Sequence, residues 1–315
     1  MTNTLELHGI TKRYDSFTAV DLLSFSIPQG CVYGLLGPNG AGKTTTIRMM
    51  IGITLPDSGE VWMFGERFRT AHLDRVGYLP EERGLYKRMK ISELLSFFAQ
   101  LKGISRVEAD KRAARWLERL DLQQWAKAKA EELSKGMQQK VQFIASVLHD
   151  PEFVIMDEFS SGLDPANARD LENILLELRK AGKTILFSTH RMDQVEKLCD
   201  EITLVNHGRA VLQGELRAVK ASYGKSSVEI EYDGDTSFLE RKDLVQSFHN
   251  SGNRIELKLA PGADSQSLLR LAADKARISK FELVEPSLEE IFIDVVSAGK
   301  NGGAALNGAA GVTNA

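Results

Sequence analysis

The sequence contains little that would place it outside the cell or within a membrane. Only two cysteines, Cys31 and Cys199, occur in 315 residues, and both lie in mostly apolar segments, so we expect reduced core thiols rather than a disulfide. Residues 1–10 lack the basic and apolar regions of a signal peptide. The longest apolar runs, such as residues 153–156, are far shorter than the roughly 20 residues of a membrane-spanning helix. We therefore expect a cytoplasmic chain that does not cross a membrane itself.

The sequence also has no large excess of charge of one sign. Forty lysines and arginines face 43 aspartates and glutamates, which gives a formal net charge of -3. This balance provides no electrostatic footprint for nucleic acid. The hydrophobic content of 43% and the charged content of 26% are those of an ordinary folded protein. Disordered and collagen-like chains are therefore excluded, and the length favours two domains.

The hydrophobic periodicity predicts an α/β fold in the first part of the chain. Residues 1–36 alternate between apolar and polar in short runs, which indicates short antiparallel strands at the N-terminus. Apolar strands at 31–36, 153–156 and 184–188 alternate with helices, as in a mainly parallel core sheet. From Ile91 onward the period becomes helical. We predict a first domain at 1–221 with a helical insert at about 90–150.

A second, small α+β domain is predicted at residues 222–297. Short strands at 228–230, 244–248, 255–259 and 278–284 surround a helix at 267–277. A last helix begins at Ser287, with Glu290 placed to complete a capping box. Residues 298–315 contain mostly glycine, alanine and asparagine, so we expect a flexible tail there.

The most specific motif is a glycine-rich loop between a predicted strand and a predicted helix. Backbone N–H groups of such a loop surround phosphates, and the helix N-terminus adds its dipole. Lys43 can reach the β- and γ-phosphate oxygens, and the Thr44 hydroxyl can bind Mg²⁺. The spacing therefore predicts a P-loop that binds a nucleoside triphosphate. The nucleotide-binding residues assigned here are Gly37, Pro38, Asn39, Gly40, Ala41, Gly42, Lys43, Thr44 and Thr45.

Two adjacent carboxylates follow a buried strand further along the chain. Asp157 ends the apolar run at 153–156, and Glu158 comes directly after it. An isolated Asp-Glu pair in this place is usually a helix cap or part of a solvated loop. Beside a P-loop, however, Asp157 can hold Mg²⁺, and Glu158 can act as the catalytic base that polarises the attacking water.

Together these motifs resemble the ATP-binding subunits of ABC transporters over about residues 5–215. A Leu-Ser-x-Gly-x-Gln signature at 133–138 precedes the Asp-Glu pair, and Ser161-Gly162-Leu163-Asp164 is similar to the family's D-loop. The resemblance implies a P-loop NTPase fold of the ABC type, with ATP and Mg²⁺ as ligands. The further residues that carry it are Tyr14 at the adenine, Ser134, Gly136 and Gln138 in the signature, Asp164 in the D-loop, and His190 as the catalytic switch histidine.

The sequence departs from the family pattern at three places. Glu81 stands where the family has the glutamine of its Q-loop, and we assign it a position close to the metal. Lys135 and Met137 replace common signature residues. The pair at 159–160, a phenylalanine and a serine, replaces the usual Pro-Phe after Glu158. The last departure is expected to loosen the loop that aims Glu158 and to lower the ATPase activity.

The resemblance also implies partners. Two ATP-binding subunits, identical or different, form a head-to-tail dimer with two ATP molecules between them, and they drive separate membrane permease subunits at the cytoplasmic face of the cell membrane. The segments 80–86, 135–140 and 285–292 are similar to a subgroup of bacterial export ATPases of the sodium-extrusion type. The loop at 78–89 is then expected to contact the permease.

Two other functions remain open at this point. A soluble ABC-type ATPase outside transport is one, although the chain has a single P-loop and no basic face for nucleic acid. The other is a regulatory subunit that binds ATP but hydrolyses it weakly, as Glu81 and Phe159 suggest.

Overall fold

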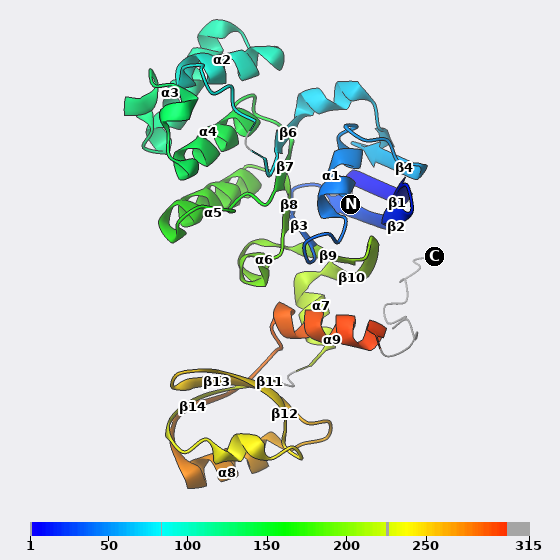
Figure 1. The fold of residues 1–315 in the computed structure, drawn as a ribbon, viewed down its shortest axis with the longest axis vertical. Coiled ribbons are helices and arrows are strands. Elements are labelled where there is room, and N and C mark those ends of the chain that lie inside the picture. The colour runs from blue at the N-terminus through cyan, green and yellow to red at the C-terminus, as the bar shows by residue number, and fades with distance from the viewer. Residues whose placement is uncertain (1, 83, 225–226, 301–315) are drawn as a thin grey trace. The chain divides into compact units, whose positions relative to one another are not determined.

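The computed structural model describes residues 2–82, 84–224 and 227–300 (Figure 1). The chain divides into two compact units, Met1–Glu215 and Leu216–Ala315. The helix α7 (Leu216–Ser222) therefore belongs to the second unit, whereas the sequence pattern placed the boundary after residue 221. No helix among the residues described combines the length and the apolar character needed to cross a bilayer.

An antiparallel sheet forms the N-terminal part of the first unit. Its strands are β1 (Asn3–Tyr14), β2 (Phe17–Pro28), β4 (Ser58–Met63) and β5 (Glu66–Arg67), in the order β2-β1-β4-β5. The prediction of short strands is wrong for β1 and β2, which have 12 residues each. Register shifts between them interrupt the strict alternation of apolar residues that marks a long strand in a sequence.

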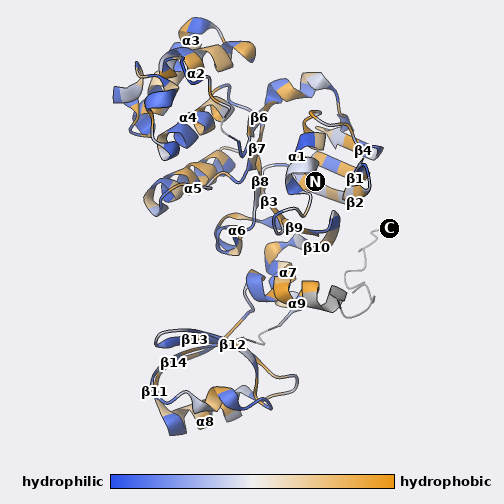
Figure 2. Ribbon diagram, viewed as in Figure 1, coloured by the Kyte–Doolittle hydropathy of each residue, from blue (hydrophilic) through white to orange (hydrophobic). Residues whose placement is uncertain are grey.

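A six-stranded, mainly parallel sheet forms the centre of the first unit, in the order β10-β9-β3-β8-β7-β6. The strands are β3 (Val32–Leu36), β6 (Val76–Leu79), β7 (Phe153–Asp157), β8 (Thr184–Thr189), β9 (Glu201–Asn206) and the antiparallel β10 (Arg209–Glu215). Every residue of β3, β7 and β8 is buried, because both faces of a parallel sheet are covered. Figure 2 shows hydrophobic residues along these strands. The carboxyl ends of β3, β7 and β8 meet at one edge.

Helices surround this sheet, and three of them form the insert predicted at about 90–150 (Figure 1). The helix α5 has a typical helix start: Asp164 is the N-cap, accepting from two backbone N–H groups, and Pro165 follows at the first helical position. The longer helices are α1 (Lys43–Met50), α2 (Ile91–Leu101), α3 (Arg106–Arg119), α4 (Lys135–Val147), α5 (Pro165–Lys180) and α6 (Met192–Leu198). Short 3₁₀ helices lie at Thr70–Arg75, Gln123–Trp125 and Ala130–Glu132.

The second unit contains an antiparallel sheet in the order β12-β13-β11-β14. Its core includes Val228, Ile230 and Leu257 on the strands and Leu268 on α8. The elements are β11 (Ser227–Gly234), a turn at Ser237–Glu240, β12 (Val245–Ser251), β13 (Arg254–Leu259), α8 (Ser265–Lys275), β14 (Ala276–Val284) and α9 (Leu288–Lys300).

The last helix starts as predicted and ends later than predicted. The backbone N–H of Ser287 donates to the Glu290 carboxylate at 3.0 Å, and the backbone N–H of Glu290 donates to the Ser287 hydroxyl at 3.2 Å, which is the predicted capping box. Helix α9 continues to Lys300, so the tail expected from residue 298 is helical at its start. Residues 301–315 of that tail lie outside the described residues.

Candidate active site

The glycine-rich loop lies between β3 and α1 and requires glycine at its two ends. Gly37 and Gly42 have φ values of 149° and 105°. A Cβ atom at Gly37 would lie 2.2 Å from the carbonyl oxygen of Val205, and one at Gly42 would lie 2.4 Å from that of Ala19. Backbone atoms cannot yield at these distances. The loop can therefore pack against β9 and β2 only with glycine at both positions.

Lys43 connects this loop to the neighbouring carboxylates. Its side chain is buried, and Nζ donates to the carbonyl oxygens of Gly37 at 2.8 Å and Pro38 at 3.2 Å. Nζ also lies 3.7 Å from Glu158 Oε1. Burial lowers the pKa of Lys43, while the negative charges of Glu158, Asp157 and Glu81 oppose that shift. The structure thus brings the P-loop lysine into contact with Glu158 and within electrostatic reach of Asp157 and Glu81.

The remaining P-loop residues leave groups accessible for a ligand. Pro38, Asn39 and Gly40 form the exposed tip of the loop, and Ala41 is buried beneath it. Thr44 and Thr45 are partly exposed in the first turn of α1. The first turn of a helix presents unpaired N–H groups and the positive end of the dipole, which suits a phosphate.

Asp157 has a buried carboxylate oxygen with no partner. The residue ends β7 and is completely buried. Its Oδ1 accepts from the Ser188 hydroxyl at the end of β8. Within the part of the chain that the structure describes, Oδ2 has no hydrogen-bond partner. A buried carboxylate oxygen without a donor is costly, and a divalent cation would satisfy it, so the site fits the Mg²⁺ that the sequence implies.

Glu158 is held in an unusual backbone conformation beside His190. Its φ is 52°, in the left-handed region, and its N–H lies 3.2 Å from both the backbone oxygen and the hydroxyl of Ser188. Its side chain is almost buried, and Oε1 lies 3.1 Å from His190 Nδ1. Such strain persists only where the surrounding structure enforces it, which is typical of functional positions.

The signature residues occupy the start of α4. Ser134 is the N-cap, and its hydroxyl accepts from the Met137 N–H at 3.3 Å. The Gln138 side chain donates to two carbonyl oxygens of the preceding turn. A Cβ atom at Gly136 would lie 3.6 Å from Leu163, so the structure brings the signature next to the predicted D-loop.

Tyr14 and Glu81 lie at the periphery of this arrangement. Tyr14 is 47% exposed at the end of β1, with Lys12 Nζ 5.7 Å from its ring centroid. No hydrogen bond among the described residues joins Tyr14 to the P-loop. Glu81 is exposed between two residues, Pro80 and Glu82, whose carbonyl oxygens accept from Gln142.

The expected loosening after Glu158 is wrong. Phe159 is 1% exposed, and its ring packs edge-to-face against Phe187 with 5.3 Å between centroids. Its backbone oxygen accepts from Gln139 at 3.2 Å, and the Ser160 hydroxyl donates to Gln194 at 3.0 Å. These contacts with α4, β8 and α6 fix the loop that the sequence pattern described as loose.

Sequence reasoning missed Ser188, which contacts both carboxylate residues. The available signal was a hydroxyl residue directly after the apolar run at 185–187, at the carboxyl end of a buried strand. It also missed Gln142, which lies on α4 and donates to the backbone on both sides of Glu81.

Comparison with known proteins identifies the two units separately. The family described as ABC transporter matches residues 20–161. The family described as ATP-binding protein DrrA1-3-like, C-terminal domain, matches residues 214–296. The two matched segments thus fall mainly on the first and second units, respectively.

Individual proteins are similar over most of the chain. The ABC transporter ATP-binding protein YhaQ of Bacillus subtilis is 42% identical over 294 residues, which cover 93% of this chain and 99% of YhaQ. The Nod factor export ATP-binding protein I of Ralstonia nicotianae is 41% identical over 217 residues, 68% of either chain. The solved structure of an ATP binding subunit of an ABC transporter is 30% identical, with a TM-score of 0.65 over 70% of this chain and 93% of that one.

Proposed function

Because this chain belongs to the family of ABC transporter ATP-binding proteins, we propose that it powers an exporter by binding and hydrolysing ATP against separate membrane permease subunits. As a member of that family it is an ATP-binding subunit and an ATPase. The similarity to a Nod factor export protein supports export as the direction of transport. The observation that carries the proposal is the cluster of Lys43, Asp157, Glu158 and His190 at the carboxyl edge of the parallel sheet.

We assign the chemistry to this cluster as follows. The P-loop N–H groups and Lys43 bind the phosphates, while Thr44 and Asp157 would hold Mg²⁺, which neutralises phosphate charge when bound. The γ-phosphate competes for the Lys43 ammonium that now faces Glu158. Glu158 then accepts a proton from water as the water oxygen attacks the γ-phosphorus, and ADP leaves with the electrons of the broken P–O bond. His190 orients the Glu158 carboxylate through Oε1.

ATP binding is proposed to join two subunits. The Ser134 hydroxyl and the Gly136 N–H lie at the N-terminus of α4, a position that favours an anion. On this proposal they bind the ATP held by the second subunit, and Asp164 of the D-loop lies at the same interface. Tyr14 presents its exposed ring to the adenine.

The dimer is tested by light scattering of Glu158→Gln protein with and without Mg-ATP. Without the base, ATP remains bound, and we expect the measured mass to double only when Mg-ATP is present. Glu152→Gln is the matched control, because Glu152 pairs with Arg75 on the surface. That control should not accumulate the dimer during turnover. A Glu158→Gln protein that remains a monomer at saturating Mg-ATP would contradict homodimerisation.

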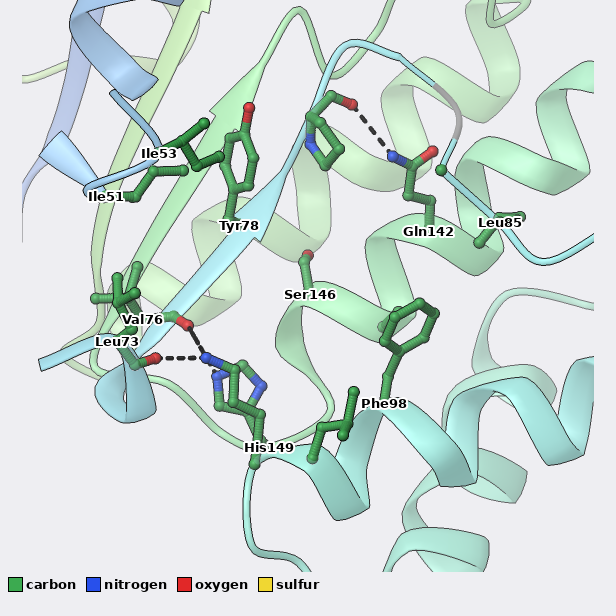
Figure 3. Close-up of a pocket in the computed structure, with 15 residues that line it drawn as sticks. Ile51, Ile53, Leu73, Val76, Tyr78, Leu85, Phe98, Gln142, Ser146 and His149 are labelled. Carbon is green, nitrogen blue, oxygen red and sulfur yellow. Dashed lines mark hydrogen bonds between the residues drawn. The ribbon is translucent and has the colours of Figure 1, made fainter. Parts of the chain in front are cut away.

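An apolar pocket beside residues 80–82, the segment that contains Glu81, is the proposed contact with the permease. It has a volume of about 410 Å³ and lies between β6, α2 and α4 (Figure 3). Most of its lining is apolar, and the exposed Tyr86 lies next to Leu85 at its margin. The lining residues labelled in Figure 3 are Ile51, Ile53, Leu73, Val76, Tyr78, Leu85, Phe98, Gln142, Ser146 and His149. A short apolar helix of a membrane subunit fits such a surface, and this fit supports the proposed peripheral position of the chain at the membrane.

Cross-linking tests this contact in the complex purified from membranes. We expect a thiol cross-linker to join Leu85→Cys protein to the permease. Val211→Cys is the control, because Val211 is exposed on β10, at the opposite edge of the six-stranded sheet from β6. Cross-links of equal yield from both positions, or from neither in an active complex, would contradict the assignment.

A further inference from the structure

Gln142 joins the signature helix to the segment that contains Glu81. Gln142 lies on α4 and is 6% exposed. Its Nε2 donates to the carbonyl oxygen of Pro80 at 3.3 Å, a bond drawn in Figure 3. It also donates to the carbonyl oxygen of Glu82 at 3.0 Å. One amide group therefore binds the backbone on both sides of Glu81.

The orientation of this amide follows from its partners. Two carbonyl oxygens can only accept hydrogen bonds, and only the NH₂ end of glutamine can donate two. Flipping the amide would turn Oε1 toward both carbonyl oxygens and lose both bonds. The side chain is thus fixed with its nitrogen toward Pro80 and Glu82.

The oxygen of the Gln142 amide makes this residue costly for the stability of the folded protein. Within the described residues, Gln142 Oε1 is buried and has no hydrogen-bond partner. An apolar side chain of similar volume would avoid this cost in a pocket lined mostly by apolar residues. Gln142 therefore combines two hydrogen bonds to residues 80–82 with one unpaired buried oxygen.

The position of Glu81 depends on this anchor. Its own side chain is exposed, so side-chain packing does not hold it. Its negative charge nevertheless raises the pKa of the buried Lys43, against the lowering by burial. The backbone of residues 80–82 therefore decides how close the carboxylate lies to the bound phosphates.

We propose that Gln142 is a positioning residue that holds the Glu81 carboxylate toward the metal-nucleotide site and ties that position to α4. Because Ser134 is the N-cap of the same helix, a shift of α4 on contact with the second subunit's ATP also moves the Glu81 segment. This inference rests on the proposed function, since it assumes that Glu81 lies close to the metal.

Amide hydrogen exchange of the full-length protein tests the anchor without any nucleotide. Gln142→Met keeps the side-chain length and removes the donor. We expect peptides that span residues 78–86 to exchange about tenfold faster in this variant. Ser146→Ala is the matched control, because Ser146 lines the same pocket from the same helix and donates to the Phe143 carbonyl of its own helix. Unchanged exchange in Gln142→Met, or equal acceleration in Ser146→Ala, would overturn the proposal.

A double-mutant cycle tests whether Gln142 acts through Glu81. We expect Gln142→Met to raise the Mg²⁺ concentration for half-maximal ATPase activity by about five- to tenfold. In the Glu81→Ala background the same substitution should add nothing, because the positioned group is gone. Gln142→Glu, which places oxygen against both carbonyls, is the second variant if Gln142→Met folds poorly.

The outcomes separate the two proposals. Additive effects of Gln142→Met and Glu81→Ala would overturn the positioning role while leaving the ATPase function intact. A wild-type protein without Mg²⁺-dependent hydrolysis would contradict the proposed function. In that case the exchange experiment still decides whether Gln142 anchors residues 80–82.

Discussion

Single polar residues at the ends of buried strands lie together in the candidate active site. Ser188 donates to Asp157 and accepts from the N–H of Glu158, so one hydroxyl near the end of β8 contacts both the last residue of β7 and the residue after it. Asp157 then retains one oxygen without a donor in the described structure. A carboxylate with one oxygen held by a hydrogen bond and the other without a donor is suited to bind a cation.

At the residue scale, His149 gives a prediction for pH dependence. Burial and the nearby Lys102 lower the pKa of His149 below its ordinary value of 6.5, while the hydrogen bond to the Val76 carbonyl opposes the shift. Asp150 also raises the pKa, and Arg112 lowers it. As the pH falls below about 6.5, the unfolded chain therefore binds a proton that the folded chain does not.

The contribution of His149 to the free energy of unfolding should consequently rise with pH up to about 6.5 and stay constant at higher pH. In His149→Gln the amide can still donate to Val76 and does not titrate. We expect urea denaturation between pH 5.5 and 7.5 to show a shallower loss of stability on acidification than in the wild type. A variant with an unchanged or steeper pH profile would contradict this origin.

At the scale of elements, strand ends and helix starts meet in one place. The P-loop connects β3 to α1, and the Asp157-Glu158 pair follows β7, which is separated from β3 only by β8. His190 follows β8 directly. Because these strands run parallel, their carboxyl ends bring residues far apart in the sequence into one site.

Two glycines of the P-loop allow the effect of a steric clash on stability to be measured apart from the effect of a positive φ. Gly37 and Gly40 both have positive φ, but a Cβ at Gly37 would contact the Val205 carbonyl, whereas one at Gly40 would have no atom within 4 Å. We expect Gly37→Ala to lower the free energy of unfolding by about 3 kcal/mol or more, and Gly40→Ala by roughly 1–2 kcal/mol. Urea denaturation without nucleotide measures both values. Equal losses of unfolding free energy in the two variants would show that the loop moves and so relieves the clash with Val205.

At the scale of the whole molecule, the chain consists of two compact units with separate cores. The first ends at Glu215 and contains all the residues assigned to ATP. The second has its own apolar core and its own capped helix α9. Both units also resemble different families of known domains. This division predicts that nucleotide binding stabilises only one part of the protein.

Scanning calorimetry of Glu158→Gln protein should therefore show two unfolding transitions. Mg-ATP at about 100 times its Kd should raise the midpoint of the first unit's transition by roughly 5–10 °C and leave the other within 1 °C or so. The Lys43→Ala variant, which loses the ammonium assigned to the phosphates, is the control and should show a much smaller shift. A single transition that moves as a whole would contradict independent units.

The sequence by itself determined the motifs to which the chemistry of the site is assigned, and the order of the elements. The P-loop, the Asp157-Glu158 pair and the signature are local patterns, and each requires particular residue types at fixed spacing. The N-cap at Asp164 and the capping box at Ser287 and Glu290 are equally local, and the structure contains both.

Tertiary structure alone decided which distant residues support that chemistry. Three contacts join separate elements. They are the hydrogen bond between Ser188 and Asp157, the hydrogen bonds from Gln142 to residues 80–82, and the packing of Phe159 against Phe187. Residue type and spacing do not contain these contacts, because they depend on strand order and on how side chains fill the space between elements. For the same reason the loop after Glu158, which departs from the family pattern in sequence, is firmly packed in the folded protein.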